Sequence, residues 1–269
     1  MACPTGARGA FVIPVSEPIQ IDTSISRVKR LQSAILTRAR LIAHSLPHRT
    51  HRAAMLTLTY REDDQWHAKH ISELLQNIRM YLSRRGLKAP YLWVAELTQR
   101  GRIHYHVLLW LPKGFTLPKP DKRGWWRWGS TRIEWARNAV GYLAKYASKG
   151  TEPMLLGHFP RGCRLHGVGG ISDLVRKCAR WWALPAYLRA ACFPADDFIR
   201  RVGGGFVGRL TGVIQAPVYG LMSVGRKSVR VRQIGPFPLG REPRPVSDPA
   251  WLIALRGLKP EHLKEFASC

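Results

Sequence analysis

The sequence has little acidic charge and few cysteines, and it lacks a long apolar run. Of its 269 residues, 17 are Asp or Glu and 43 are Lys or Arg, which leaves a net charge of +26. The five cysteines are widely spaced and never form Cys-x-x-Cys, which argues against a disulfide framework and a zinc module. No apolar run reaches the ~18 residues of a membrane span, and the N-terminus shows no signal-peptide pattern. These absences favour a cytoplasmic protein with reduced thiols and no membrane partner.

The excess of positive charge predicts a polyanionic partner, and nucleic acid is the first choice. The Lys and Arg residues are dispersed along the chain, so we expect them to line a groove rather than to form a basic tail. Gly203-x-Gly205-x-x-Gly208 has the letters of a dinucleotide fingerprint. However, no acidic residue occurs from 209 to 241, where the partner of the ribose is expected, so we interpret the match as a loop.

The patterned segments are expected in the order strand, helix, strand, strand, helix. The expected strands are 55–60, 91–97 and 102–111, of which the last two form a hairpin through residues 98–101. A helix is expected over 67–85, with Gly86 as its stop, and another from a capping box at Ser130, Thr131 and Glu134 to Lys149. This order predicts an α+β fold, with a central antiparallel sheet covered by helices as in ferredoxin-like and RNA-recognition domains.

Three regions are expected on this basis. Residues 1–50 comprise a loose leader over 1–22 and a basic amphipathic helix over 24–45. Residues 51–150 form the α+β domain, and residues 151–269 form a basic C-terminal extension that is first helical and then rich in β-structure. In the extension, the helical part is expected over 171–191 with an interruption at Pro185.

Two histidines stand two residues apart in the apolar segment 102–111. The side chains of His104 and His106 therefore point to one face of the sheet, while the odd positions face the helices. Imidazole nitrogens bind divalent cations, and Glu96 in the preceding strand supplies a carboxylate if the hairpin register brings it alongside. The sequence thus predicts a metal site at Glu96, His104 and His106, with Gln99 as a substitute for the third ligand. The alternative is a pair of partly buried or surface histidines.

The stretch Tyr142-Leu-Ala-Lys145-Tyr146-Ala-Ser-Lys149 repeats Tyr-x-x-Lys twice. At helical spacing this repeat aligns two phenols and two ammonium groups along one stripe. A phenol with its usual pKa near 10 is a weak nucleophile, and the field of a lysine or a metal favours its phenolate character. Together with the histidine pair, the repeat suggests DNA strand transfer. An ordinary amphipathic surface is the alternative.

The segments MLTLTY, His104-Tyr-His106 and YLAKYASK resemble the three motifs of the HUH rolling-circle replication initiators. The resemblance covers residues 53–150, and it is to the two-tyrosine branch of single-stranded DNA phages. The tryptophan-rich loop is most similar to that of initiators from filamentous phages, prophages and plasmids. The resemblance implies a site-specific nickase and strand transferase that uses Mg²⁺ or Mn²⁺ and acts in the cytoplasm of a bacterial host.

By this resemblance, Tyr142 or Tyr146 attacks a phosphate of single-stranded origin DNA and keeps a 5′-phosphotyrosyl end. A host polymerase extends the freed 3′-hydroxyl, a partner helicase unwinds the duplex, and the second tyrosine ends the round. His104, His106 and Glu96 hold the metal in this scheme. Lys145 and Lys149 are supporting cations.

DNA contacts are expected from two loops. Aromatic rings stack on exposed bases while cationic side chains hold phosphates. Alternatively, one or two of the tryptophans anchor their loop in the core. The candidates are Arg100 and Arg102 at the hairpin, with Arg123, Trp125, Trp126, Arg127 and Trp128 in the loop 112–130, which we expect to be mobile.

Three other functions are compatible with parts of this pattern. A single-tyrosine HUH transposase or relaxase shares the histidines but not the doubled tyrosine. A non-enzymatic single-stranded-DNA-binding protein accounts for the charge and the tryptophans but not for the combination of motifs. A metal-dependent nuclease that activates water cleaves DNA but leaves both ends free.

Overall fold

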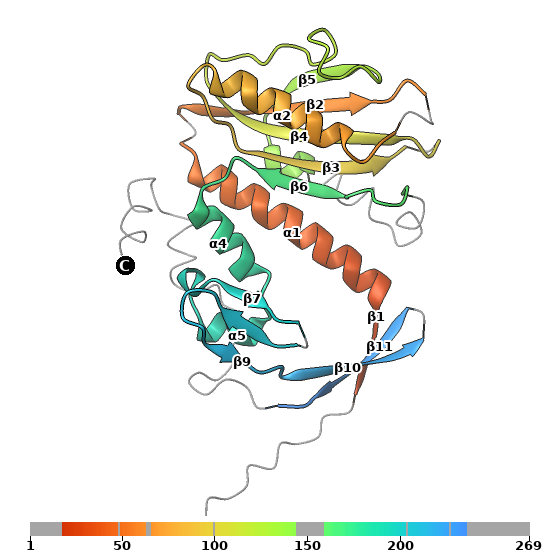
Figure 1. The fold of residues 1–269 in the computed structure, drawn as a ribbon, viewed down its shortest axis with the longest axis vertical. Helices are drawn as coiled ribbons and strands as arrows, with labels where there is room; N and C mark the ends of the chain where they lie inside the picture. Colours follow the sequence, from red (N-terminus) through yellow and green to blue (C-terminus); the bar gives the residue numbers. More distant parts are fainter. Residues whose placement is uncertain are drawn as a thin grey trace, which may run out of the picture.

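The computed structural model describes residues 18–47, 49–62, 66–98, 100–143, 159–202, 204–225 and 227–235. A five-stranded antiparallel sheet lies between helices on its two faces, and two smaller sheets lie below it in the view of Figure 1. The predicted α+β class is therefore confirmed. Within the described ranges, none of the helices combines the length and the apolar character that a membrane span requires.

The central sheet has the strand order β5-β2-β4-β3-β6, and every neighbouring pair is antiparallel. Its strands are β2 (His51–Thr59), β3 (Tyr91–Leu97), β4 (Ile103–Pro112), β5 (Thr131–Ala136) and β6 (His166–Gly169). β3 and β4 form the expected hairpin, which turns at residues 98–101 with Gly101 at a φ of 78°. β4 occupies the middle of the sheet, so its side chains are enclosed by strands on both sides.

One face of the sheet is covered by α2 (His70–Ser83). The apolar residues of this helix recur at intervals of three and four, so they form a stripe that packs against the odd positions of β4. After the helix, Gly86 adopts a φ of 68°, a left-handed conformation that glycine accepts without strain. The helix expected over residues 67–85 is thus confirmed, with a start three residues later.

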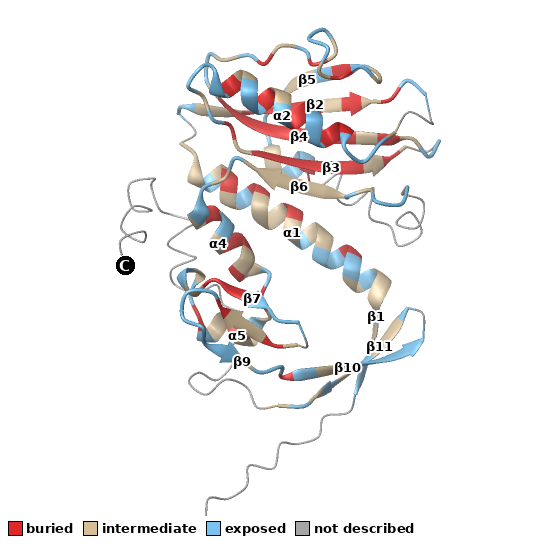
Figure 2. Cartoon of the chain, viewed as in Figure 1, coloured by how far each residue is buried: buried red, intermediate tan, exposed pale blue. Residues whose placement is uncertain are grey.

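The other face is covered by α1 (Thr23–Ser45), which begins at Asp22. The Asp22 carboxylate caps the helix by accepting hydrogen bonds from the backbone N–H groups of Ser24 and Ile25. Ile35, Ala39 and Ile42 pack in a second apolar cluster with the even positions of β4. The sheet is therefore the middle layer of three, and Figure 2 shows buried residues along its strands.

The expected opening of the tyrosine helix is wrong. Thr131 and Glu134 do not form a capping box, because they lie in β5, an edge strand that pairs with β2. Helical residues begin only at 139, where the Asn138 side chain accepts from the Gly141 N–H at 2.8 Å. Alternation of Ile133 and Trp135 with polar residues explains the strand, since both side chains can pack on one side.

Two further strands fall outside the expected segments. Residues 19–22 were expected in a loose leader, yet they form β1 (Ile19–Asp22), which pairs with β11 (Ser228–Gln233). β6 follows residue 150 and pairs with β3, so the sheet takes one edge from the C-terminal region. The N-terminal and C-terminal parts of the chain therefore contribute to the same folded unit.

The rest of the C-terminal region is helical and then β-rich, as expected. Its helices are α4 (Asp173–Trp182) and α5 (Ala186–Ala191), separated at Pro185, and a 3₁₀ turn, η1 (Pro194–Asp196), follows. Its short strands are β7 (Phe198–Arg200), β8 (Phe206–Gly208), β9 (Ile214–Gln215) and β10 (Tyr219–Gly225). The buried Asp197 carboxylate holds them near α4 by pairing with Arg180 and Arg209 at 2.5 and 3.5 Å.

The loop 112–130 is anchored in the α2-side core by one tryptophan. Trp126 is 1% exposed, and its indole N–H donates to the Thr59 carbonyl at 2.9 Å. Trp128 stacks on His70 with ring centroids 3.5 Å apart, and Trp125 meets Tyr81 edge-on. The expectation of a mobile loop is therefore wrong for this tryptophan segment, because its rings fill the core beside α2.

Gly129 offers a test of this packing. A Cβ there would overlap the Thr59 backbone carbonyl, which cannot move without disturbing the end of β2. We expect Gly129→Ala to lower the free energy of unfolding by about 1–3 kcal/mol in urea denaturation, as overpacking does elsewhere. Gly225→Ala is the matched control, since a Cβ there meets nothing within 4 Å. Equal stability of the two variants would contradict this account of the loop.

Candidate functional site

The histidine pair lies on the face of the sheet that α1 covers. Leu108 and Trp110 pack in the α1-side cluster, so His104 and His106, which have the same parity in β4, share that face. The odd residues Tyr105 and Val107 lie in the α2-side cluster. The expected division of β4 into an imidazole face and a helix-packing face is confirmed.

Glu96 lies beside the histidines because of the hairpin register. It is directly opposite His104 in the β3–β4 pair, and its Oε2 atom lies 2.8 Å from His106 Nε2. An ionised carboxylate only accepts, so the His106 Nε2–H donates to Glu96, and in the neutral ring Nδ1 accepts from the Thr57 hydroxyl at 3.3 Å. His106 is 4% exposed, so these partners replace water around a buried ring.

His104 is partly exposed at the end of β4 next to the hairpin turn. Burial lowers the pKa of His104, and the neighbouring His106 and Arg102 lower it further, while the Glu96 carboxylate acts in the opposite direction. His104 is therefore a neutral imidazole near pH 7, which is the form that binds metal ions. Thr59 lies opposite it on β2.

The donor types on this face fit a divalent cation. Two imidazoles and a carboxylate are a common ligand set for divalent metals, and the register brings all three side chains to neighbouring positions. In the part of the chain that the structure describes, however, no three His, Cys, Asp or Glu side chains converge into a metal cluster. The structure brings Glu96 and His106 together as a hydrogen-bonded pair and leaves His104 beside them. Gln99 lies outside the described residues.

The first tyrosine of the repeat lies on the same side of the sheet. The helical residues 139–143 follow β5, and Leu143 is fully buried in the α1-side cluster with Met55 and Leu108. Tyr142 is 37% exposed, and its N–H donates to the Asn138 carbonyl at 3.0 Å. Its side chain is therefore accessible to a ligand. Lys145, Tyr146 and Lys149 lie outside the described residues.

The expected DNA-contacting residues divide into two groups. Arg100 is exposed at the hairpin turn, and Arg102 lies near His104, whose pKa its charge lowers. Arg123 and Arg127 are exposed in the loop 112–130, on the α2 side of the sheet. Trp125 and Trp128 are partly buried there, and Trp126 is a core residue, so its indole is not free to stack on a base.

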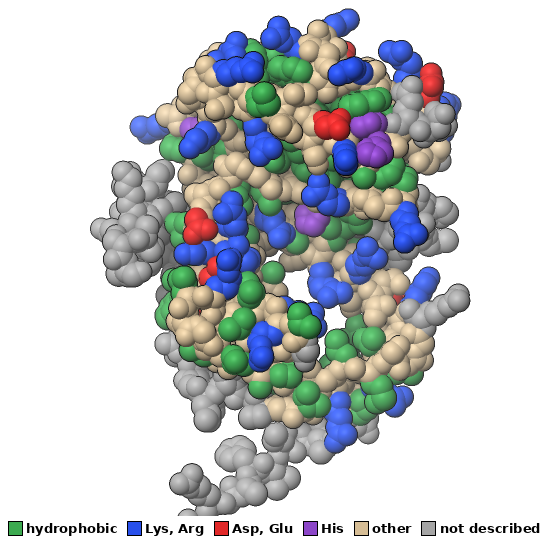
Figure 3. All heavy atoms as spheres, in the orientation of Figure 1, with side chains coloured by type: hydrophobic (Ala, Val, Ile, Leu, Met, Phe, Trp, Pro, Cys, Tyr) green, Lys and Arg blue, Asp and Glu red, His purple; other side chains and the backbone are tan. Residues whose placement is uncertain are grey.

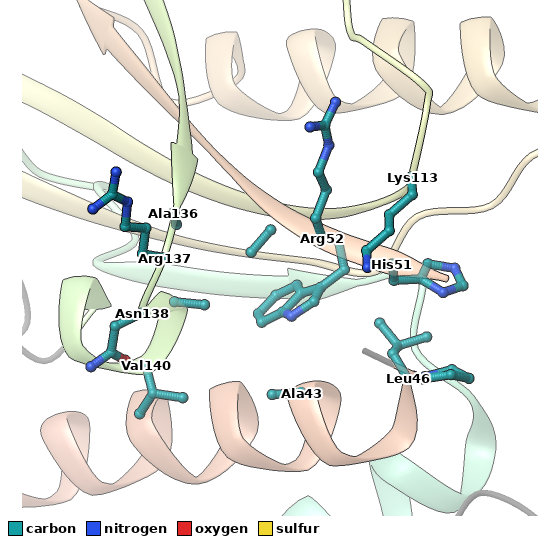
Figure 4. A pocket seen from close by; sticks show the side chains of 13 residues that line it. Ala43, Leu46, His51, Arg52, Lys113, Ala136, Arg137, Asn138 and Val140 are labelled. Atoms are coloured by element: carbon teal, nitrogen blue, oxygen red, sulfur yellow. The ribbon is translucent and has the colours of Figure 1, made fainter. Parts of the chain in front are cut away.

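A pocket of about 410 Å³ opens at the opposite end of the sheet, and none of the predicted site residues lines it. Ala43 and Leu46 of α1, His51 of β2, Lys113 and Asn138 are among its lining residues (Figure 4). The Arg52 side chain leaves the pocket and places its guanidinium 3.2 Å from the centre of the Trp135 ring. The charged groups of this pocket do not converge as the His106–Glu96 pair does, so the sheet face remains the better candidate site.

The sequence did not identify Thr57 as a site residue. It lies opposite His106 on β2, and its hydroxyl is within hydrogen-bond distance of the ring. A signal is present in Met55-Leu-Thr57-Leu-Thr59, where the two threonines alternate with leucines in a strand. Their alternation places both hydroxyls on the face that also carries the histidines.

Comparison with known proteins agrees with this location of the site. Residues 53–151 match the model of a family described as Replication-associated protein ORF2. The match supports the class of HUH replication initiators and a role in DNA replication for this segment, which holds Glu96, both histidines and both tyrosines. Searches of curated proteins and of solved structures found no match.

The electrostatic description of His104 can be tested by titration. Since Glu96 raises the pKa of His104 and Arg102 lowers it, we expect Glu96→Gln to decrease this pKa and Arg102→Gln to increase it. The measurement is an NMR pH titration of the His104 ring in EDTA-treated protein, with Arg40→Gln on the exposed side of α1 as a control. Shifts of the same sign in the two variants would contradict the arrangement.

Proposed function

We propose that this protein initiates rolling-circle replication by nicking single-stranded origin DNA and joining the 5′ end to a tyrosine. The observation that carries the proposal is the shared sheet face, which holds the His106–Glu96 pair, His104 and the helical residues that bear Tyr142. The family match of residues 53–151 supports it. The origin would belong to a phage, prophage or plasmid.

The tyrosines carry the covalent chemistry in this proposal. The phenolic oxygen of Tyr142 or Tyr146 attacks the phosphorus, the bond from phosphorus to the 3′-oxygen breaks, and that oxygen leaves as a 3′-hydroxyl after taking up a proton. The phosphotyrosyl bond conserves the energy of the phosphodiester, so no nucleotide hydrolysis is needed. The other tyrosine repeats the attack at the regenerated origin, and the released 3′-hydroxyl resolves the first link to close a circle. Lys145 and Lys149 supply positive charge beside the phenols.

A divalent cation, Mg²⁺ or Mn²⁺, would be held by His104, His106 and Glu96. When bound, it polarises a non-bridging oxygen of the scissile phosphate and so favours attack on phosphorus. Thr57 orients the His106 ring through Nδ1, as outer-shell partners of metal ligands commonly do. The low pKa of His104 keeps its ring ready to bind at neutral pH.

The charge of the protein suits a long polyanion rather than a small ligand. Lys and Arg side chains surround the hollow between the central sheet and the β10–β11 hairpin in Figure 3. Arg100 and Arg102 at the β3–β4 turn are proposed to hold phosphates near the site, while Arg123, Arg127, Trp125 and Trp128 contact DNA farther away. A host polymerase extends the 3′ end, and a separate helicase unwinds the duplex.

The adduct between protein and DNA is the first test. Purified protein is incubated with candidate single-stranded origin DNA and Mn²⁺, then analysed on a denaturing gel. We expect a denaturation-resistant adduct that Tyr142→Phe and Tyr146→Phe each reduce and that the double variant lacks, because the phenolic oxygen is the nucleophile. Tyr219→Phe, a substitution at an exposed tyrosine of β10, is the matched control.

The outcomes of this gel separate the alternative functions. Loss of the adduct on changing one tyrosine, with no effect of the other, would indicate single-tyrosine chemistry of the transposase or relaxase type. Cleavage without an adduct would indicate hydrolysis by activated water. Binding without either product across a range of candidate origins would favour a non-enzymatic DNA-binding protein.

Metal binding has a direct measurement of its own. We expect His106→Ala to abolish detectable Mn²⁺ binding in EPR titration, and Thr57→Val to weaken it by about tenfold to a hundredfold through loss of the outer hydrogen bond. His51→Ala at the other end of β2 is the control. If His106→Ala binds Mn²⁺ as well as the unchanged protein does, the proposed ligand set is wrong.

A further inference from the structure

Helix α1 directs an arginine toward the sheet face that holds the site. Arg38 lies three residues after Ile35 and four before Ile42, and both isoleucines are buried against the sheet. These spacings place Arg38 on the same stripe of the helix. Its side chain is half-buried, whereas Arg40 of the same helix is exposed.

The partner of Arg38 on the sheet is His166 of β6. Val94 of β3 lies between His166 and His106, since it is the register partner of both. Register partners point to the same face, so His166 and His106 face α1 from positions two strands apart, roughly 10 Å. Burial and the nearby Arg38 charge lower the pKa of His166 to about 4, which places the guanidinium close to a neutral imidazole.

The guanidinium of Arg38 has donors left for a ligand. It donates to the Ala34 carbonyl of its own helix at 3.0 Å, and burial lowers its pKa. Among the residues that the structure describes, no carboxylate lies within 4 Å of it, and Glu96 is already engaged with His106. A half-buried cation without a carboxylate is costly, and a bound anion would offset that cost.

We propose that Arg38 and His166 form a second phosphate site, which holds a DNA phosphate next to the one at the histidine pair. The planar guanidinium can donate two parallel hydrogen bonds to phosphate oxygens, and a neutral imidazole can donate a third. Both side chains are partly exposed, so a strand lying along the face can reach them. This inference rests on the proposed function for the identity of the strand, and it assigns α1 and β6 a role in holding it.

The site is tested by DNA binding, without cleavage. The probe is a short fluorescent single-stranded oligonucleotide of mixed sequence, and its affinity is measured by fluorescence anisotropy over a range of salt concentrations in EDTA. We expect Arg38→Gln to weaken binding about tenfold or more, because a charge-assisted contact is lost. The slope of log K against log salt should fall in magnitude by about 0.7, the value for one phosphate contact of a single strand.

Two matched variants make the result specific. Arg40→Gln removes the same charge from the exposed side of α1, and we expect it to bind with the affinity and slope of the unchanged protein. Arg38→Lys keeps the charge but not the paired donors, so we expect intermediate affinity. Equal losses in Arg38→Gln and Arg40→Gln would reveal only a general field and overturn the site, as would unchanged binding by Arg38→Gln.

Stability provides the remaining arm. Since Arg38 has no carboxylate partner in the described chain, Arg38→Gln should unfold at the same temperature as the unchanged protein or higher. A clear drop in its thermal stability would show that the guanidinium is structural and overturn the proposal. An adduct that forms normally while Arg38→Gln binds DNA unchanged would reject this site alone. Loss of binding by Arg38→Gln in a protein that forms no adduct would reject the nickase and retain the site.

Discussion

The register of β4 between β2 and β3 is the constraint on which the candidate site depends. This register sets His104 opposite Glu96 and His106 opposite Thr57. A slip of one residue would turn the imidazoles toward α2 and bring Tyr105 to the other face. The slip is opposed by the apolar packing of Tyr105 under α2 and by the hydrogen bond from Trp66 to its hydroxyl at 2.8 Å. The core on one face thus positions the polar groups on the other.

The two faces of the sheet compensate the loss of hydration differently. On the α2 side, apolar side chains and Trp126 exclude water, and the indole N–H is satisfied by a backbone carbonyl. On the α1 side, the buried His106 and the half-buried Glu96 would be costly alone, and their mutual hydrogen bond together with Thr57 replaces the lost hydration. Such a satisfied polar group inside a sheet layer is rigid, and rigidity is what a site for phosphate chemistry requires.

The sequence predicted the elements whose pattern is repeated and missed those whose pattern is short. α2 has five buried apolar residues at helical spacing, and β4 has ten residues in strict alternation, so both were found. β5 was mistaken for a helix start because Thr131 and Glu134 have the spacing of a capping box, and only pairing with β2 decides between the two. β6 is four residues with two glycines, and nothing local marks it as a strand.

The candidate site was predictable to a similar degree. Alternation alone placed His104 and His106 on one face, and the hairpin placed Glu96 near them, although its contact with His106 depends on the register. Arg38 and His166 are 128 positions apart in the chain, and they meet only because β6 joins the edge of β3 beneath α1. Pairing of β6 also covers the edge of β3, and β1 is completed by β11. The region after residue 150 therefore helps to build the sheet face on which the candidate site lies, in addition to any contact of its own with DNA.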